Sequence, residues 1–462
     1  MTVSVVLFTS DLRLHDHPPL RAALDRSDQV VPLFVQDSDV RAVGFDVPNR
    51  RAFLADCLAD LDTGLRERGG RLVVRTGRVA DEVAAVVGET GATEVHLAAG
   101  VSRYAALREE RLRAALAERE CALVVHDAVV TVVPPGAVTP SGSDHYAVFT
   151  PYFRRWSQER PRDPLAAPRR ISVPAALAGD ARDGTAPGAP ARSGATAPAL
   201  PPGGERAGRR RMSAWLRRGI DAYEERHDDL AGDATSRLSP YLHFGALSAT
   251  ELVHRARGRG GPGAEAFVRQ LCWRDFHHQV LAARPESAAD DYRDRGDHWR
   301  SGRAAEADIA AWKTGRTGYP LVDAAMRQLL HEGWMHNRGR LLAASFLTKT
   351  LYADWRVGAR HFLDHLVDGD LANNQLNWQW AAGTGTDTRP NRVLNPVAQA
   401  RRFDPDGAYV RRWVPELAGL TAPDIHQPWR LPEKERAALD YPEPLVSLTD
   451  GLARFQEART RS

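Results

Sequence analysis

The run VSVVLF at residues 3–8 begins a regular alternation of short apolar segments and helical patterns, and this alternation decides the fold of the first part of the chain. Four further β-branched runs follow, at residues 30–35, 71–75, 93–97 and 122–126. Helical patterns separate them, for example NRRAFLADCLADLDTGLRERG at 49–69 and YAALREERLRAALAER at 104–119. Strands that alternate with helices predict a parallel sheet with helices on both faces. We therefore predict an α/β, Rossmann-like, doubly wound domain over residues 1–130.

Length, composition and charge bound the class of protein. The 462 residues exceed one ordinary hydrophobic core, so we expect two domains. The 43% hydrophobic and 26% charged residues are typical of a soluble globular protein, and no apolar stretch reaches the roughly 18 residues of a membrane span. The N-terminal apolar run lacks the basic flank of a signal peptide. A net charge of +3 permits nucleic-acid binding without requiring it.

Cysteine and histidine spacing gives no sign of a metal site. The three widely separated cysteines are Cys57, Cys121 and Cys272. They form no CxxC pair, which argues against a disulfide framework and favours a reducing, cytoplasmic location. His361 and His365 could share one helix face, but the zincin pattern needs Glu where Phe362 stands, so we interpret both as structural. The run GTGTDT at 383–388 is too short and wrongly spaced for a phosphate loop.

The second part of the chain changes character. Residues 160–208 are rich in Pro, Ala and Gly and poor in aromatic residues, and we interpret residues 131–208 as an interdomain linker. Amphipathic helices are predicted at residues 213–228, 248–257, 264–283, 320–331, 335–352 and 356–366. We therefore expect residues 209–462 to form an all-α domain.

Hydroxyl groups gather at a predicted turn before a helix, at Thr235, Ser236 and Ser239. Such a turn can hold a phosphate or pyrophosphate through its hydroxyls and free backbone N–H groups, with Arg237 as counter-charge. The same pattern also suits a plain helix cap followed by Pro240. Taken alone, the segment favours the cap.

Two other segments mix polar and apolar groups. MHNRGR at 335–340 places polar side chains at the head of an apolar helix, which suits a buried anionic or heteroaromatic ligand and a solvated helix N-terminus equally. DGDLANNQLNWQW at 368–380 crowds acids, amides and indoles together. It does not suit the surface, because Trp is large and apolar, and it does not suit a dry core, because Asp and Asn need partners.

Several motifs occur in a fixed order along the chain, namely SDLRLHD, TSRLSPYL, WRDF, TGYPLVDAAMRQL, GWMHNR, DGDLANN…WQWAAGTGTD, NP at 395–396 and YVRRWVPEL at 409–417. Together they resemble the DNA photolyase and cryptochrome family, and within it the microbial class I cyclobutane pyrimidine dimer photolyases. The resemblance spans residues 3–445, interrupted mainly by the 160–208 tract. It implies a deoxyribodipyrimidine photo-lyase, a carbon–carbon lyase acting on UV-damaged DNA. In this family, light-excited reduced FAD passes an electron to a dimer that is flipped out of the duplex.

The resemblance also implies FAD in the helical domain, at positions that match the family's cofactor site. These are Tyr223, Thr235, Ser236, Arg237, Leu238, Ser239, Arg274, Asn337, Arg340, Asp368, Asp370 and Asn374. The hydroxyls would hold the pyrophosphate, and Arg340 would pair with Asp368 beside the isoalloxazine. Asn374 would face flavin N5, where a neutral amide can accept from N5–H or donate to a bare N5. A polar cofactor would thus partner the acids and amides of 368–380.

The tryptophans divide into two groups under the resemblance. Trp378 and Trp355 match an electron relay from flavin to surface, and Trp299 is the candidate for its exit, although the spacing to Trp312 is longer than in the family pattern. The pair expected to receive the flipped dimer is Trp273 and Trp380. Core packing is the alternative role for each indole.

Lesion preference rests on two departures from the family pattern. Gln270 stands where dimer photolyases usually have Glu, and Leu341 stands where they usually have Met. Glutamine at this position resembles the (6-4) photolyases, but MHNRGR lacks that group's paired histidines, so dimer repair leads. Asn337 and Arg338 would meet the lesion or its backbone. The basic residues expected at DNA phosphates are Arg392, Arg401 and Arg402.

The remaining expectations concern the antenna and the alternatives to dimer repair. In this family the N-terminal domain carries a light-harvesting chromophore, for which 8-hydroxy-5-deazaflavin is favoured over a folate or FMN. The alternative functions are (6-4) photoproduct repair, a cryptochrome-like blue-light photoreceptor, and an unrelated electron-transfer flavoprotein. We expect a cytoplasmic monomer without a membrane partner.

Overall fold

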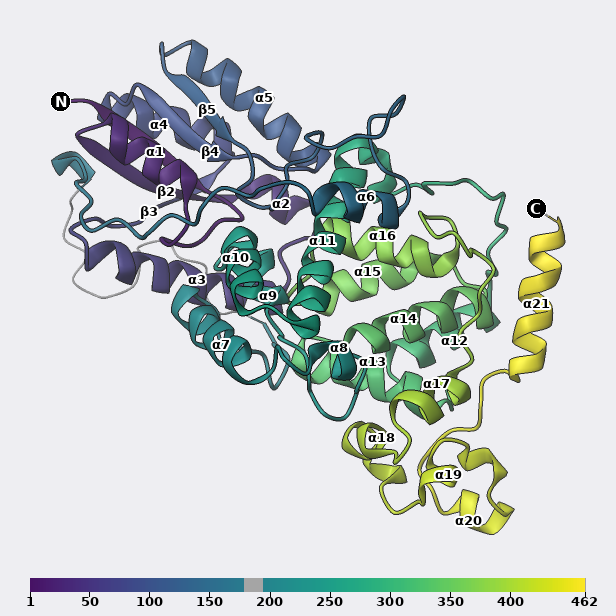
Figure 1. The fold of residues 1–462 in the computed structure, drawn as a ribbon. Helices are drawn as coiled ribbons and strands as arrows, with labels where there is room; N and C mark the ends of the chain where they lie inside the picture. The colour runs from purple at the N-terminus through teal and green to yellow at the C-terminus, as the bar shows by residue number, and fades with distance from the viewer. Residues whose placement is uncertain (178–193, 462) are drawn as a thin grey trace. The chain divides into compact units, whose positions relative to one another are not determined.

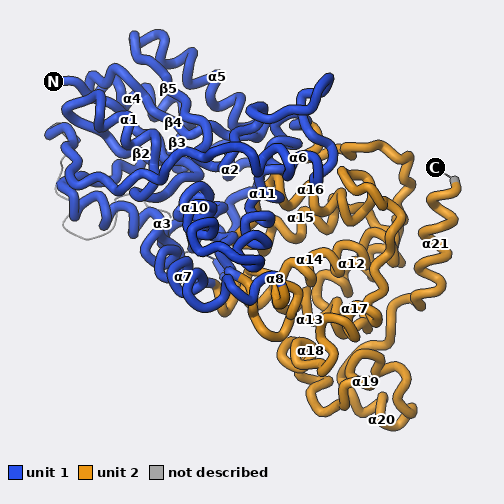
Figure 2. Tube along the Cα trace, in the orientation of Figure 1, with its two compact units in different colours: residues 1–196, 201–224, 236–285 blue, residues 197–200, 225–235, 286–462 orange. Residues whose placement is uncertain are grey.

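The computed structural model describes residues 1–177 and 194–461, so the centre of the predicted linker lies outside the described residues. By its contacts the chain divides into two compact units (Figure 2). Unit 1 comprises residues 1–196, 201–224 and 236–285, and unit 2 comprises residues 197–200, 225–235 and 286–462. The domain limits expected from the sequence, at residues 130 and 208, stay a prediction.

Unit 1 contains a five-stranded parallel sheet in the order β3-β2-β1-β4-β5 (Figure 1). The strands are β1 (Val3–Phe8), β2 (Gln29–Asp37), β3 (Val73–Gly77), β4 (Glu94–Ala98) and β5 (Ala122–His126). The helices between them are α1 (Pro18–Arg26), α2 (Ser38–Ala42), α3 (Pro48–Arg66), α4 (Val79–Thr90) and α5 (Arg103–Ala117). The strand order reverses between β1 and β4, which makes the carboxyl ends of these strands the topological switch point. The doubly wound prediction is confirmed.

Both faces of the sheet are buried. Val5 and Leu7 of β1 pack with Val83 of α4 and Leu112 of α5 in one apolar cluster. Val6 points to the other face, because successive strand residues alternate, and it is also fully buried. Helix α1 contacts β1, β2, β4 and β5. Burial on two faces explains the continuous apolar runs of β1, β2 and β4, whereas the edge strands β3 and β5 are only partly buried.

The remaining secondary structure of unit 1 is helical. Its helices are α6 (Phe149–Trp156), α7 (Glu205–Arg218), α9 (Ser239–His243), α10 (Ala249–Arg259) and α11 (Pro262–Ala283), with the short α8 (Tyr223–Arg226) at its boundary with unit 2. The prediction of one helix over 213–228 is wrong, because α7 ends at Arg218 and Gly219 is its C-cap. The ring of Trp215 lies where a Cβ on Gly219 would be, 2.3 Å away, so the turn there requires glycine.

Unit 2 is all-helical, as expected from the sequence. Its helices are α12 (Arg303–Lys313), α13 (Pro320–Glu332), α14 (Asn337–Ser345), the π-helix η3 (Phe346–Thr350), α15 (Trp355–His365), α16 (Leu371–Ala382), α17 (Pro396–Phe403), α18 (Ala408–Trp413), α19 (Ala422–Ile425), α20 (Glu433–Ala437) and α21 (Leu448–Arg461). The 3₁₀ turns of the chain are η1 (Ala175–Leu177), η2 (Pro285–Ala288), η4 (Pro415–Leu417) and η5 (Pro428–Arg430). The single helix expected over 335–352 is thus broken by a π-helix, a feature often found at functional sites.

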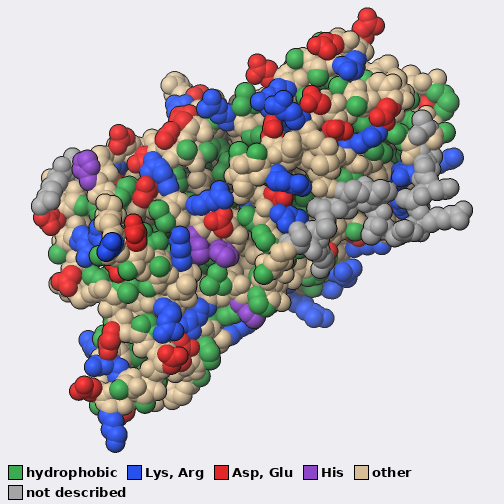
Figure 3. All heavy atoms as spheres, turned by 180° about the vertical axis from the view of Figure 1, so that it is seen from behind, with side chains coloured by type: hydrophobic (Ala, Val, Ile, Leu, Met, Phe, Trp, Pro, Cys, Tyr) green, Lys and Arg blue, Asp and Glu red, His purple; other side chains and the backbone are tan. Residues whose placement is uncertain are grey.

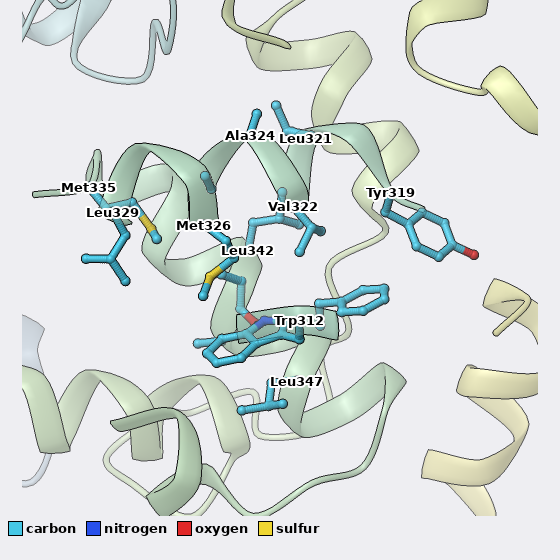
Figure 4. Packing of buried hydrophobic residues seen from close by; sticks show 14 of the residues in the cluster. Trp312, Tyr319, Leu321, Val322, Ala324, Met326, Leu329, Met335, Leu342 and Leu347 are labelled. Atoms are coloured by element: carbon cyan, nitrogen blue, oxygen red, sulfur yellow. The ribbon is translucent and has the colours of Figure 1, made fainter. Parts of the chain in front are cut away.

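The core of unit 2 surrounds Trp312 (Figure 4). This indole is fully buried among Val322, Met326, Leu342 and Leu347, and its N–H donates to the backbone carbonyl of helix α14 over 3.1 Å. The bond satisfies the one polar group of the ring, so the large apolar side chain is buried without an unpaired donor. Helices α12, α13 and α14 are thereby fixed to one another.

The surface mixes both signs of charge. Lys and Arg side chains are interspersed with Asp and Glu over the face seen in Figure 3, in keeping with the small net charge of +3. Within residues 1–177 and 194–461, no helix is both long enough and apolar enough to cross a bilayer.

Candidate functional site

The predicted site residues are distributed over both units. Unit 1 contains Tyr223, Ser236, Arg237, Leu238, Ser239, Gln270, Trp273 and Arg274. Unit 2 contains Thr235, Trp299, Asn337, Arg338, Arg340, Leu341, Trp355, Asp368, Asp370, Asn374, Trp378, Trp380 and Arg392. Each group has its own internal geometry.

Helix α14 begins with the polar head that the sequence indicated. The imidazole of His336 caps the helix by accepting from the backbone N–H of Arg338 over 3.1 Å, and Asn337 is exposed in the first turn. The guanidinium of Arg338 forms a bidentate pair with Asp228 and lies 4.4 Å over the ring of Phe403. A capped helix start therefore holds one arginine in a fixed orientation.

Arg340, one turn further along α14, forms a partly buried ion pair with Asp368. Its Nη2 donates to both carboxylate oxygens of Asp368 over 3.0 and 2.8 Å, and its Nε donates to the carbonyl of Met335 over 2.9 Å. The Asp368 side chain is only 3% exposed, whereas Arg340 is 25% exposed. The Arg340 guanidinium therefore stays partly accessible, while Asp368 largely compensates its charge.

The start of helix α16 is fixed by its own polar residues. Asp370 is the N-cap, and its carboxylate accepts from the backbone N–H and from the side-chain amide of Asn373, each over 2.7 Å. Asn374 is buried, and its Nδ2 donates to the carbonyl of Ala359 over 3.0 Å and to Gln375 Oε1 over 2.9 Å. Both amide hydrogens of Asn374 are therefore used within unit 2, which leaves its carbonyl oxygen as the group able to meet a ligand.

The hydroxyl-rich turn before α9 contains an unsatisfied group. The Thr235 hydroxyl oxygen is buried and has no hydrogen-bond partner among the described residues. Ser236 accepts from the backbone N–H of Leu238 over 3.3 Å, and Arg237 has a φ of 50°, which produces the sharp turn before Ser239 begins the helix. A buried hydroxyl without a partner is costly, so this turn is better explained as a ligand site than as a plain cap.

Two further cofactor candidates lie in unit 1. Tyr223 is buried, with its ring edge-to-face against Trp215 at 5.3 Å and Phe267 at 5.8 Å. Arg274 is held by a hydrogen bond from its Nη1 to the carbonyl of Val130 over 2.6 Å.

Helix α11 carries the other indole predicted to meet the lesion. Trp273 is half-buried and stacks on Phe149 of α6, with ring centroids 3.7 Å apart and planes inclined by 5°. Gln270 is exposed three residues earlier, on the same face of the helix. Asp275, two residues after Trp273, accepts from Trp156 Nε1 over 2.9 Å and so joins α11 to α6, the helices of the two stacked rings, and burial raises the pKa of its carboxyl. The stacked ring is thereby mounted on a rigid base.

A small hollow in unit 2 gathers the remaining lesion candidates. Its lining residues are Leu341, Ser345, Lys349, Trp380, Ala381, Asp387, Arg392 and Leu394. Trp380 is half-buried and Arg392 is exposed, so the hollow has one aromatic wall, and Lys349, Arg392 and Asp387 give its lining both signs of charge. Arg401 and Arg402, which the sequence predicted at DNA phosphates, lie on α17, where Arg401 donates to Gln427 over 2.8 Å.

Lys349 in this hollow was missed by sequence reasoning. It is 2% exposed, and its Nζ donates to the backbone carbonyls of Pro390 and Arg392, each over 2.7 Å. Burial lowers its pKa to about 8. The signal was present as a single lysine in the segment SFLTKTL at 345–351, which has no other charged residue.

The three relay candidates have different surroundings. Trp378 is 2% exposed and lies edge-to-face against Trp312 at 5.9 Å and Phe362 at 4.9 Å. Trp355 is fully buried, and its Nε1 donates to the carboxylate of Asp291 over 2.7 Å. Trp299 is half-buried, in the segment before α12.

Comparisons with known proteins identify the family of the chain. The family model described as "DNA photolyase" matches residues 4–169, and that described as "FAD binding domain of DNA photolyase" matches residues 267–461. The chain is 64% identical to a deoxyribodipyrimidine photo-lyase of Streptomyces griseus over 99% of each chain.

Solved structures give the same result for the fold. A bacterial class III photolyase from Agrobacterium tumefaciens is 30% identical and superposes with a TM-score of 0.90, over 100% of this chain and 98% of the other. An archaeal photolyase from Sulfolobus tokodaii with two FAD molecules is 29% identical, with a TM-score of 0.86 over 100% of both chains.

Proposed function

Because this chain belongs to the DNA photolyase family, we propose that it repairs cyclobutane pyrimidine dimers in DNA in a light-dependent reaction. The observation that carries the proposal is the hollow of unit 2, where Leu341, Trp380 and Arg392 lie together. At about 10 Å³ the hollow holds no more than one water molecule. We therefore assign the open side of the Trp380 ring, rather than the interior of the hollow, to the flipped-out pyrimidine pair, and Arg392 to a neighbouring phosphate. Leu341 and Arg392 are about 50 residues apart in the sequence, so the fold, rather than their sequence spacing, brings them together.

The described residues fit FAD as the resident cofactor. The buried Thr235 hydroxyl lacks a partner, as expected of a group that bonds a pyrophosphate oxygen. The Arg340–Asp368 pair and the free carbonyl oxygen of Asn374 are the groups assigned to the isoalloxazine. When bound and reduced, FAD supplies light absorption and a single transferable electron.

Asn374 favours the reduced form through its hydrogen-bond polarity. Because both hydrogens of its amide nitrogen are donated to Ala359 and Gln375, the group left for the flavin is its carbonyl oxygen, which accepts from N5–H of the reduced form. Asp368 compensates the charge of Arg340 and holds it in one rotamer. These residues orient and polarise the site without exchanging protons themselves.

The lesion end of the site is assigned to aromatic and polar side chains. Trp380 provides a stacking surface, Leu341 a smooth apolar contact, and Arg392 a phosphate contact. Gln270 and Trp273 share one face of α11, and we assign both to contacts with the lesion. We assign Asn337 and Arg338 of α14 to the lesion or the DNA backbone beside it. Trp378, Trp355 and Trp299 are assigned to the electron relay.

Unit 1 is proposed to hold an antenna chromophore at the carboxyl ends of β1 and β2. The Nε of Arg108 is buried there without a hydrogen-bond partner among the described residues. Burial lowers the pKa of Arg108, while the carboxylates of Asp11, which follows β1, and of Asp37, the last residue of β2, act in the opposite sense. We favour 8-hydroxy-5-deazaflavin over a folate or FMN, in a cytoplasmic monomer whose residues 1–130 and 209–462 form the antenna and catalytic domains.

The test is light-dependent repair of a defined lesion. The purified, photoreduced protein is incubated with an oligonucleotide carrying one thymine cyclobutane dimer, under blue light and in the dark, and intact thymines are followed by chromatography. Restoration only in the light is expected. A parallel oligonucleotide carrying a (6-4) photoproduct is expected to remain unrepaired.

Repair of the (6-4) photoproduct without repair of the thymine dimer would assign Gln270 to (6-4) repair. Failure with both lesions, in protein that binds reducible FAD, would favour the cryptochrome-like photoreceptor.

A further inference from the structure

Tyr352 occupies an unusual position between η3 and α15. It is 4% exposed, and its backbone has a φ of 53°, in the left-handed region that a bulky residue seldom adopts. Such a conformation persists only where the surroundings enforce it. Here its ring lies against that of Trp299, with centroids 5.0 Å apart and planes inclined by 42°. The strained backbone therefore holds a phenol against the candidate exit tryptophan of the relay.

The hydroxyl of Tyr352 points at a buried carboxylate. It donates to Asp297 Oδ1 over 2.8 Å, and Asp297 Oδ2 accepts from Arg459 Nη1 over 3.0 Å. The side chains of Asp297 and Arg459 are 1% and 8% exposed. Arg459 also donates to the carbonyl of Ala382 over 2.9 Å, so helix α21 fixes the carboxylate in place. Both oxygens of Asp297 are engaged, one by a cation and one by the phenol.

This arrangement is what oxidation of a phenol requires. A phenol that loses an electron becomes a very strong acid, so oxidation proceeds readily only where a base takes the proton at the same time. Burial raises the pKa of Asp297, which makes its carboxylate a better proton acceptor than an exposed one. Arg459 keeps that carboxylate ionised in the resting state, and it remains bonded to Oδ2 after Oδ1 is protonated.

We propose that Tyr352 is the terminal electron donor of the relay and that Asp297 is its proton acceptor. The proposal rests on the relay function assigned above to Trp378, Trp355 and Trp299. Trp299, having lost one electron inward toward a light-excited oxidised flavin, takes one electron from Tyr352. The O–H bond of Tyr352 breaks, the proton moves to Asp297 Oδ1, and Trp299 returns to its neutral closed-shell form. A soluble thiolate then gives one electron to the tyrosyl radical and becomes a thiyl radical, and Asp297 returns the proton to the Tyr352 oxygen.

Tyr319 offers a matched control in the same unit. It is 2% exposed and its ring lies 5.2 Å from Trp429, but its hydroxyl donates to the backbone carbonyl of Val446 over 2.7 Å. A carbonyl accepts a hydrogen bond but is too weak a base to take the proton. Tyr319 therefore has the burial and the neighbouring indole of Tyr352 without the base.

The experiment identifies the radical formed in the full-length, FAD-loaded protein. The oxidised protein is illuminated without added reductant, frozen at set delays, and examined by electron paramagnetic resonance. The wild type is expected to give a tyrosyl spectrum that decays faster when a thiol is added. Tyr352→Phe is expected to lose the tyrosyl signal and show a tryptophanyl one, Asp297→Asn to reduce the tyrosyl yield, and Tyr319→Phe to match the wild type.

A tryptophanyl spectrum in the wild type, a tyrosyl spectrum that survives Tyr352→Phe, or no protein radical at all would overturn the proposal. Dimer repair by chemically reduced protein is measured on the same samples, because it needs no electron from the relay. Repair that is unchanged in Tyr352→Phe, together with any of these spectra, places the failure in the Tyr352 assignment. Loss of repair in the wild type places it in the proposed function.

Discussion

Trp378 and Trp380 lie two residues apart on helix α16 and have opposite surroundings. Two residues correspond to about 200° around an α-helix, so the indoles point to opposite sides. Trp378 is 2% exposed and is enclosed by Trp312 and Phe362. Trp380 is half-buried and lines the hollow with Lys349 and other polar residues.

The difference shows how one helix can serve two tasks. The side of α16 that carries Trp378 encloses the indole between the rings of Trp312 and Phe362, which suits a residue that is oxidised only transiently. The outward side offers a surface and a rim of charge, which suits a substrate. Burial, rather than residue type, distinguishes the two tryptophans.

The largest expected effect separates the two indoles directly. Trp378→Phe should abolish photoreduction of the oxidised flavin while dimer repair by chemically reduced protein persists. Trp380→Ala should leave photoreduction intact and weaken binding of dimer-containing DNA by about 1–3 kcal/mol, the stacking energy of one base. Flavin absorbance under illumination and titration with labelled oligonucleotide measure the two quantities. Similar losses of both activities in both variants would contradict the division.

The space around Trp378 provides a second test. A Cβ at Gly358 of α15 would lie 2.2 Å from the Trp378 ring and 2.6 Å from Leu347, so Gly358→Ala should lower the free energy of unfolding by about 1–3 kcal/mol. Gly88→Ala in α4 is the control, because nothing lies within 4 Å of the added methyl group, and alanine there should stabilise slightly. Denaturant titration followed by circular dichroism compares them, and an unchanged midpoint for Gly358→Ala would contradict tight packing at Trp378.

Acid should affect the Trp378 side through His361. This imidazole is 8% exposed, contacts Trp312 at 5.5 Å, and is faced by His365 and Lys313, and burial lowers its pKa from 6.5 to about 3. Between pH 6.5 and pH 3, His361 is protonated in the unfolded state but neutral in the folded state. The free energy of unfolding is therefore highest above about pH 6.5 and falls as the pH is lowered toward 3. His361→Gln should therefore show a shallower loss of unfolding free energy over this range.

The control is His331→Gln, at an exposed histidine, and this variant should show the same dependence of unfolding free energy on pH as the wild type. Parallel curves for wild type and His361→Gln would show that another group carries the acid sensitivity. Thermal unfolding at a series of pH values measures all three proteins.

The smallest expected effect concerns the rim beside Trp380. Arg392→Ala should weaken DNA binding at low salt and reduce the slope of log affinity against log salt concentration by about one, because one phosphate contact is lost. Exposed Lys434→Ala on α20 should leave the slope unchanged. Equal slopes for wild type and Arg392→Ala would remove Arg392 from the phosphate contacts.

Periodicity in the sequence predicted the sheet well and the site poorly. Each β-branched run lies within two residues of a strand, and the central strands β1, β2 and β4 need continuous apolar residues because they are buried on both faces. The helix expected over 213–228 failed at Gly219, where the position of Trp215 decides the turn. Lys349 was missed because only the folded chain brings the carbonyls of Pro390 and Arg392 to it. The assignment of Arg340 to Asp368, 28 residues away, came from the family resemblance, since spacing alone does not reveal it.

The contact between Arg459 and Asp297 has a practical consequence for anyone handling the protein. Helix α21 holds Asp297 and the end of α16 through Arg459, and Phe455 packs beside Lys349. A truncation before Leu448 would leave a buried carboxylate without its cation, although the removed segment looks dispensable in the sequence. An affinity tag is better placed ahead of Met1, which is 91% exposed, than behind α21.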